Sequence, residues 1–259
     1  QQNLYSLKVR LINDDTIVEK TYRIAFRNVE LNRSSYIQEN GKFEFVVNGT
    51  KVFLLGSNWV PVDALKHTDK DRMYKALEHL VDLGCNAVRV WGGGIYEDDE
   101  FYTFCDEHGI FVWQDFMMGC AIYPRNNEFI ENIKNEINFV VNRLSYHPSI
   151  CLWAGDNECD VACQWAGDKI NPNSNLITRN VIPSILLKID NSRPYIPSSP
   201  FEDEKGYEHY TLLPEDHLWG PRDYFRGDYY SNANTYFVSE TGYHGCPGIF
   251  SLEKFINKT

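Results

Sequence analysis

The sequence predicts an α/β protein built as a (β/α)8 barrel. Short apolar runs of strand length alternate with longer stretches of helical periodicity, and Gly or Pro separates many of them. Strands that alternate with helices in this way form a parallel sheet. Seven such strands can be counted before the chain stops in the middle of a predicted helix. We therefore expect a barrel that is truncated before its last strand.

The first 37 residues follow a different pattern. Tyr5–Leu11 alternates apolar and polar residues, Thr21–Leu31 does so less strictly, and Asn13, Asp14 and Asp15 between them predict a turn. This pattern indicates an antiparallel hairpin. Because two strands alone are not stable, we expect residues 1–37 to be the C-terminal part of a β-sandwich followed by a linker over residues 32–41. Residues 38–259 are then the barrel, incomplete at its C-terminus.

A second hairpin leads into the barrel. Phe43–Val47 and Lys51–Leu55 flank Asn48 and Gly49, a dipeptide typical of tight hairpin turns. The predicted barrel strands that follow are 54–59, 86–91, 110–115, 150–154, 193–198, 217–220 and 236–240. The predicted helices are 69–83, 98–108, 127–145, 175–188 with Pro183 inside it, and 251–257. A long irregular loop is expected after Glu158.

Composition narrows the classes of partner. The net charge of −11 argues against nucleic acid and anionic membranes as partners. No apolar stretch approaches the ~20 residues of a membrane span. No signal peptide is visible, although the abrupt start at Gln1 is typical of a fragment. Exposed edges of an incomplete barrel would favour self-association.

The seven cysteines are odd in number and scattered, and most lie in apolar runs. This favours a reducing, cytoplasmic compartment over a disulfide framework. Cys159 and Cys163 stand four residues apart, but no second pair with zinc-ligand spacing follows. We therefore expect no metal.

Functional side chains are expected at one end of the barrel. Five residues fall at the C-terminal ends of predicted strands, where barrel enzymes place their catalytic groups: Trp59, Trp91, Asp115, Glu158 and Glu240. Two facing carboxylates are the minimum equipment for glycoside hydrolysis, since one donates a proton and the other attacks the sugar. Indole rings offer flat faces to sugars. The alternative is that these Trp residues only pack in a core and that the acidic strand ends are polar turns.

Several motifs resemble glycoside hydrolase family 2. They are Arg89–Glu97, Trp113–Phe116, His147–Ile150, Trp153–Glu158 and Val238–Gly242, which occur in the family's order. The resemblance covers roughly residues 41 to 247 and is greatest to the branch that contains β-mannosidase, exo-β-glucosaminidase and endo-β-mannosidase. It implies a TIM barrel preceded by an immunoglobulin-like domain, of which residues 1–37 resemble the end.

The resemblance also implies roles for individual residues. Glu158 resembles the general acid/base, and Glu240 resembles the nucleophile. Asn157 resembles the amide that contacts the sugar 2-hydroxyl, and Arg89 resembles the arginine that keeps the nucleophile ionised. Further residues expected to line the sugar pocket are Trp91, Trp219 and His217.

Two positions depart from the family pattern. Asp156 stands where the family usually has Asn, and Thr241 stands where it usually has Phe. An acid at position 156 would either raise the pKa of Glu158 or point away into the barrel.

The sequence therefore predicts a retaining exo-β-glycosidase that acts on a carbohydrate without a cofactor, with a β-mannoside as the leading substrate. Exo-β-glucosaminidase, β-galactosidase and β-glucuronidase remain alternatives, and Asp156 is a candidate for the extra acid that a glucosaminidase needs. A catalytically silent carbohydrate-binding fragment is the alternative outside the enzymes.

Overall fold

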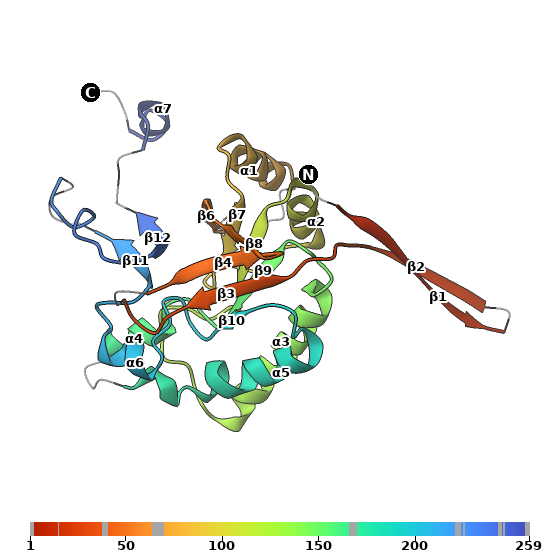
Figure 1. The fold of residues 1–259 in the computed structure, drawn as a ribbon. Coiled ribbons are helices and arrows are strands. Elements are labelled where there is room, and N and C mark those ends of the chain that lie inside the picture. Colours follow the sequence, from red (N-terminus) through yellow and green to blue (C-terminus); the bar gives the residue numbers. More distant parts are fainter. Residues whose placement is uncertain are drawn as a thin grey trace.

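Five parallel strands, paired in sequence order, form the centre of the molecule (Figure 1). The computed structural model describes residues 3–14, 16–37, 41–63, 70–165, 170–220, 224, 226–242, 245 and 247–256. The central strands are β6 (Gly56–Trp59), β7 (Ala87–Val90), β8 (Phe111–Asp115), β9 (Ile150–Ala154) and β10 (Tyr195–Ile196). Two further strands, β11 (Glu215–Trp219) and β12 (Phe237–Gly242), pair with each other in parallel. All seven lie where the sequence predicts barrel strands.

Helices cover the outward face of the central strands. They include α1 (Lys70–Asp82), α2 (Asp99–His108), α3 (Asn127–Leu144) and α5 (Ile182–Ile189). Outward residues such as Val88 and Trp153 share one buried cluster with Leu77 of α1, Phe101 of α2 and Ile137 of α3. Because side chains alternate along a strand, the neighbouring residues of the same strands face the barrel interior. The apolar stripe of each helix therefore fixes which strand residues are left for the site.

A three-stranded antiparallel sheet packs against the interior side chains. It consists of β3 (Val29–Arg33), β4 (Phe43–Val47) and β5 (Thr50–Val52), and it lies across the barrel strands in Figure 1. Phe43 and Phe45 pack with Trp113 of β8, Leu152 of β9 and Phe237 of β12 in a second buried cluster. The hairpin predicted around Asn48 and Gly49 is therefore part of the barrel's interior packing. Both turn residues have positive φ, 51° and 77°, as such a turn requires.

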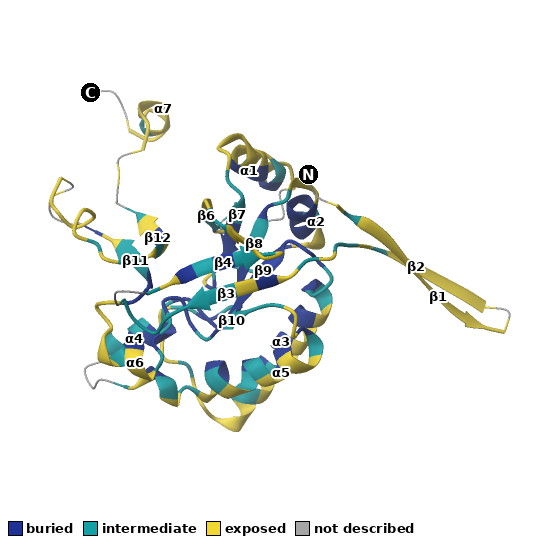
Figure 2. Cartoon of the chain, in the orientation of Figure 1, coloured by how far each residue is buried: buried dark blue, intermediate teal, exposed yellow. Residues whose placement is uncertain are grey.

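The first hairpin is confirmed as an antiparallel pair, but its bounds differ from the prediction. It is formed by β1 (Tyr5–Asn13) and β2 (Thr16–Ile24), projects from the molecule and is almost entirely exposed (Figure 2). The predicted strand Thr21–Leu31 is wrong as a single element, because β2 ends at Ile24 and β3 begins at Val29. The predicted linker 32–41 likewise begins too early, since β3 continues to Arg33. The Arg27 guanidinium explains the break, since it donates to the Pro148 and Ile150 carbonyls at 2.6 Å each and fixes the chain against the barrel.

The segment after Glu158 also differs from the prediction. The expected irregular loop begins instead as a helix, α4 (Cys159–Trp165), followed by a 3-10 turn at Pro172–Ser174. A further short helix, α6 (Glu204–Glu208), follows β10 and was not predicted. The Asp156 carboxylate accepts from the Cys159 backbone N–H at 3.1 Å and so caps the first turn of α4. A seven-residue helix is too short for its periodicity to stand out in the sequence.

The remaining helices agree with their predictions more closely. The stretch predicted over 175–188 begins as a π-helical segment, Ile177–Val181, and Pro183 falls in the first turn of α5. Proline is tolerated there because that N–H needs no helical partner. The helix predicted over 251–257 is the short α7 (Ile249–Leu252), and position 257 lies outside the described residues. Within the described part of the chain, no helix is long and apolar enough to cross a membrane.

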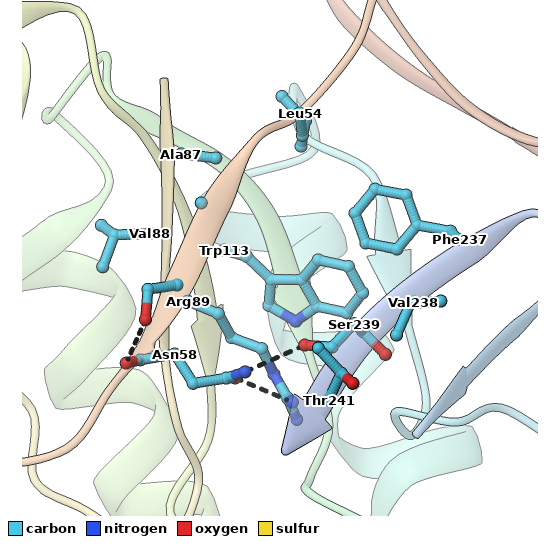
Figure 3. A pocket seen from close by; sticks show the side chains of 12 residues that line it. Leu54, Asn58, Ala87, Val88, Arg89, Trp113, Phe237, Val238, Ser239 and Thr241 are labelled. Carbon is cyan, nitrogen blue, oxygen red and sulfur yellow. Dashed lines mark hydrogen bonds between the residues drawn. The ribbon is translucent and has the colours of Figure 1, made fainter. Parts of the chain in front are cut away.

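A cavity separates β6 from β12. It has a volume of about 260 Å³, and its lining includes Leu54, Ala87, Arg89, Phe237 and Thr241. Asn58 reaches across it and donates from Nδ2 to the Ser239 carbonyl at 3.0 Å (Figure 3). Strands β6 and β12 therefore lie on either side of a space that side chains bridge.

Candidate active site

The guanidinium of Arg89 is the centre of the site. Arg89 lies on β7, faces the barrel interior and is 5% exposed. It donates to Glu240 Oε1 at 2.6 Å, to Asn157 Oδ1 at 2.8 Å and to both oxygens of Asp115 at 2.8 and 3.2 Å. It also donates to Asn58 Oδ1 at 3.2 Å (Figure 3). One arginine on β7 thus connects side chains from β6, β8, β12 and the turn after β9.

Asp115 holds Arg89 in place. Its side chain is completely buried, and it also accepts from the Trp113 indole at 2.9 Å and the Gly92 backbone N–H at 3.0 Å. Burial raises the pKa of Asp115 to about 6, against the opposing effect of the Arg89 charge. Asp115 is therefore a buried partner of the arginine at the C-terminal end of β8.

Both oxygens of Glu240 are hydrogen-bonded. Oε1 accepts from Arg89, and Oε2 accepts from the Trp219 indole at 2.8 Å. The side chain is 7% exposed. The two donors come from opposite sides, β7 and β11, and they fix the direction of the carboxylate. A buried carboxylate held in this way is oriented for attack on an electrophile, with a positive charge beside it.

Glu158 lies at the point where the chain turns from β9 into α4. Its φ is 58°, in the left-handed region that non-glycine residues seldom occupy. Its N–H donates to the Ser199 carbonyl at 2.8 Å, and its own carbonyl accepts from Ala162 at 2.8 Å. Strained backbone of this kind clusters at functional sites. Here the turn directs the side chain toward Glu240.

His217 lies between the two glutamates. Its Nδ1 is 2.7 Å from Glu158 Oε1 and 3.5 Å from Glu240 Oε2. Burial acts to raise the pKa of Glu158, but hydrogen bonding and charge from His217, with smaller contributions from Cys120 and Arg89, outweigh it and leave that pKa below its ordinary value. The free site therefore favours the ionised form of Glu158.

The three groups are close enough to act on one atom. One ligand atom each from Glu158, His217 and Glu240 all lie within 4.8 Å of one another. Among the described residues, this is the set that could hold a metal ion. The same spacing suits two carboxylates that act on one anomeric carbon, since retaining glycosidases separate their carboxyl groups by about 5–5.5 Å.

The comparisons identify the family. A family model described as glycosyl hydrolases family 2, TIM barrel domain, matches residues 39–194. The chain belongs to glycosyl hydrolase family 2. It is 39% identical over 254 residues to a β-mannosidase of Bos taurus and 35% identical over 272 residues to β-mannosidase B of Aspergillus flavus. These alignments cover 91% and 98% of this chain but only 29% and 32% of the relatives.

A solved structure agrees with these relatives. The crystal structure of a β-D-mannosidase from Dictyoglomus thermophilum matches all of this chain with a TM-score of 0.87 and 34% identity, and the match covers 32% of that protein. The chain therefore spans about a third of the length of these relatives.

The structure brings most of the predicted site residues of this family 2 barrel together. Arg89, Asn157, Glu158, His217 and Glu240 are joined by direct hydrogen bonds or ion pairs. Asn157 is itself 1% exposed, and its amide orientation is set by Arg89 at Oδ1 and by Cys120 at Nδ2.

The predicted tryptophans are placed differently from one another. Trp219 is 44% exposed and bonds to Glu240. Trp91 is half-buried, and its indole lies against Gly93, where an added Cβ would meet the ring at 2.0 Å. Trp59 is not brought to the site. Its indole packs on Phe101 in the outer core and donates to Glu97 at 2.8 Å, because successive strand residues face opposite sides and Asn58 takes the inward position.

The two residues that depart from the family pattern, Asp156 and Thr241, lie in different environments. Asp156 points away from Glu158, since its Oδ1 accepts from Ser198 Oγ at 2.5 Å and from Cys159 N. Thr241 is exposed at the cavity between β6 and β12.

Several site residues were missed by the sequence analysis. They are Asn58, Cys120, Ser199 and Glu215, and each contacts a residue described above. Ser199 Oγ lies 2.6 Å from Glu215 Oε1 and 3.2 Å from His217 Nε2. The register Asn58↔Arg89, which follows from pairing the predicted strands, could have found Asn58. Cys120 has no sequence signal, because it lies in a turn of no regular period.

Proposed function

We propose that the protein is a retaining exo-β-glycosidase that hydrolyses terminal non-reducing β-mannosides. The observation that carries this proposal is the pair Glu158 and Glu240, whose carboxylates face each other across His217 at the catalytic end of a family 2 barrel. The named relatives, each described as a β-mannosidase, support the choice of sugar.

In the proposed mechanism Glu240 attacks the anomeric carbon. Arg89 and Trp219 each occupy one oxygen of the attacking carboxylate, so the attack requires no large rearrangement of the side chain. A covalent glycosyl-enzyme forms while Glu158 gives its proton to the leaving oxygen. Glu158 then removes a proton from water, and the water releases the sugar with its configuration retained.

Glu158 must become protonated when the substrate binds. In the free site, His217 and its neighbours lower the pKa of Glu158. A sugar bound between the glutamates excludes water from a side chain that is now 15% exposed, and this desolvation favours the protonated acid. When Glu240 is esterified, its negative charge is lost and the ionised base form of Glu158 is favoured again. The two steps thus require opposite forms of Glu158, and the site can supply both.

The test is a panel of 4-nitrophenyl β-glycosides assayed with the whole protein. The β-mannoside should be the preferred substrate over the β-glucosaminide, β-galactoside and β-glucuronide. The Glu240→Ala variant should be inactive, and added azide should restore turnover with an inverted product. Preference for another sugar would replace the proposed substrate, whereas no turnover of any glycoside would favour the silent binding fragment. Asp156 is buried against Ser198, so it is not available as the extra acid that a glucosaminidase would need.

We propose further that an eighth parallel strand occupies the space between β6 and β12. Support comes from the cavity there and from the exposed apolar residues beside it, Leu55 on the β6 side and Val238 on β12. In the same way, the β1–β2 hairpin is proposed to be part of an immunoglobulin-like sandwich over residues 1–37. One of its faces exposes Tyr5, Leu7, Val9 and Leu11 in alternation, which is the pattern of a sheet face that packs on a second sheet.

A further inference from the structure

Cys120 lies beside the proposed acid/base. Its Sγ is 3.3 Å from Glu158 Oε2, to which the thiol donates, and 3.3 Å from Asn157 Nδ2, from which the sulfur accepts. His217 Nδ1 lies 2.7 Å from the other oxygen of Glu158, so each carboxyl oxygen has one hydrogen-bond partner. The thiol therefore has two partners, and both are residues that the proposed reaction uses.

The backbone holds Cys120 in this position. Its N–H donates to the Asn157 carbonyl at 2.8 Å, while the Asn157 N–H donates to the Met118 carbonyl at 2.9 Å, as in a short parallel bridge. Cys120 has a φ of 53° and Glu158 a φ of 58°. Two left-handed residues from separate turns thus face each other, and their side chains meet.

The thiol remains protonated under ordinary conditions. Partial burial, together with Glu158 as hydrogen-bond partner and as negative charge, raises the pKa of Cys120 to about 11. It is therefore a hydrogen-bond donor to the carboxylate rather than a nucleophile or a metal-binding thiolate.

We propose that Cys120 is the positioning residue of the acid/base, which orients the Glu158 carboxyl and the Asn157 amide for the bound sugar. This inference rests on the proposed glycosidase function. Without the thiol, Glu158 Oε2 loses its donor and the Asn157 amide is fixed from the Arg89 side alone. Proton transfer to the leaving group should then suffer, while nucleophilic attack by Glu240, whose donors are Arg89 and Trp219, should not.

The test compares two β-mannosides that differ in their need for a proton. The 2,4-dinitrophenyl mannoside has a leaving group that departs almost unaided, whereas β-1,4-mannobiose requires general acid catalysis. In Cys120→Ala, kcat/KM on the acidic plateau should fall about tenfold for mannobiose, a fraction of the 10²–10⁴ that general acid catalysis contributes. It should fall less than about threefold for the dinitrophenyl substrate.

The pH profile gives a second readout. The charged and titratable groups around Glu158 include His217, Arg89, Glu240, Asp216 and Cys120 itself. The thiol favours the ionised form of Glu158. Removing it should therefore move the basic limb of kcat/KM to higher pH. Cys120→Ser keeps a donor and should restore both the mannobiose rate and the limb. Cys85→Ala, which removes a half-buried thiol outside the site, should leave both unchanged.

The outcomes separate the inference from the function on which it rests. Wild-type protein that hydrolyses neither substrate would overturn both. Active wild type combined with a Cys120→Ala variant that loses both substrates equally, or neither, and has an unmoved pH limb would overturn only the role of Cys120. Melting temperatures of the Ala and Ser variants show whether folding is affected, and a folded Ser variant without restored mannobiose activity would also contradict the inference.

Discussion

Asp156→Asn tests whether a buried carboxyl beside the proposed acid/base is held in its neutral form. Asp156 is completely buried, and its Oδ2 has no hydrogen-bond partner. Burial and the nearby charge of Asp160 raise its pKa to about 8, although Ser198 and the Cys159 N–H act in the opposite direction. An amide at this position has nearly the shape of the protonated acid and cannot ionise.

The sign of the effect follows from proton linkage. The folded protein keeps the proton on Asp156 up to about pH 8, whereas the unfolded chain releases it near pH ~4. Between these values the folded state binds more protons, so the free energy of unfolding falls as pH rises. Because folded Asp156 keeps its proton, the free energy of unfolding falls by about 1.4 kcal/mol for each pH unit of rise in this range, and by about 4 kcal/mol at most at pH 7. Asp156→Asn removes this pH-dependent loss of stability, so the variant should become more stable relative to wild type as pH rises.

The assay is urea unfolding followed by tryptophan fluorescence at several pH values between 4.5 and 8. Trp153, whose side chain is buried on β9 three residues before Asp156, is a suitable reporter. The difference between Asp156→Asn and wild type should widen steadily with pH. Asp82→Asn, which alters an exposed carboxyl at the end of α1, should show no such trend. A difference that stays constant across this pH range would refute the reasoning.

Two further predictions concern the neighbours of the glutamates. Arg89→Met should abolish turnover and also cost about 3–5 kcal/mol of stability, because it leaves the buried Asp115 and Glu240 without their cation. Arg89→Lys should recover much of the stability but little activity, as measured by unfolding and by kcat. Full activity in either variant would contradict the role of Arg89. His217→Gln should move the basic limb of kcat/KM to higher pH, because the hydrogen bond and charge interaction from His217 that lower the pKa of Glu158 are lost. An unmoved limb would show that His217 does not act on Glu158.

The parts of the site that the sequence predicted share a physical reason. Glu158 and Glu240 follow apolar runs long enough to be recognised as strands, and the C-terminal ends of parallel strands meet at one rim. Their convergence therefore required only the correct periodicity and fold class. Arg89 was found through a motif on a third strand, and its buried contacts with Asp115 and Glu240 agree with the role that the resemblance implied.

The parts that the sequence did not predict depend on contacts between residues that are far apart in the chain and on which way each strand residue faces. Trp59 was selected for its residue type, but strand alternation assigns the inward position to Asn58. The strand 21–31 was split because Arg27 binds carbonyls more than 120 positions away in the chain. Cys120 reaches Glu158 only because two turns with left-handed residues meet. No local pattern encodes these long-range contacts.

The central claim is that Glu240 is the nucleophile of a retaining β-mannosidase. It is tested most directly by incubating the whole protein with 2-deoxy-2-fluoro-β-mannosyl fluoride and mapping the adduct by peptide mass spectrometry. The geometry of Arg89, Trp219 and Glu240 predicts a single fluoromannosyl ester on the peptide that contains Glu240, and none in Glu240→Gln. An ester on Glu158, or hydrolysis of mannosides with inversion and no trapped adduct, would contradict this account.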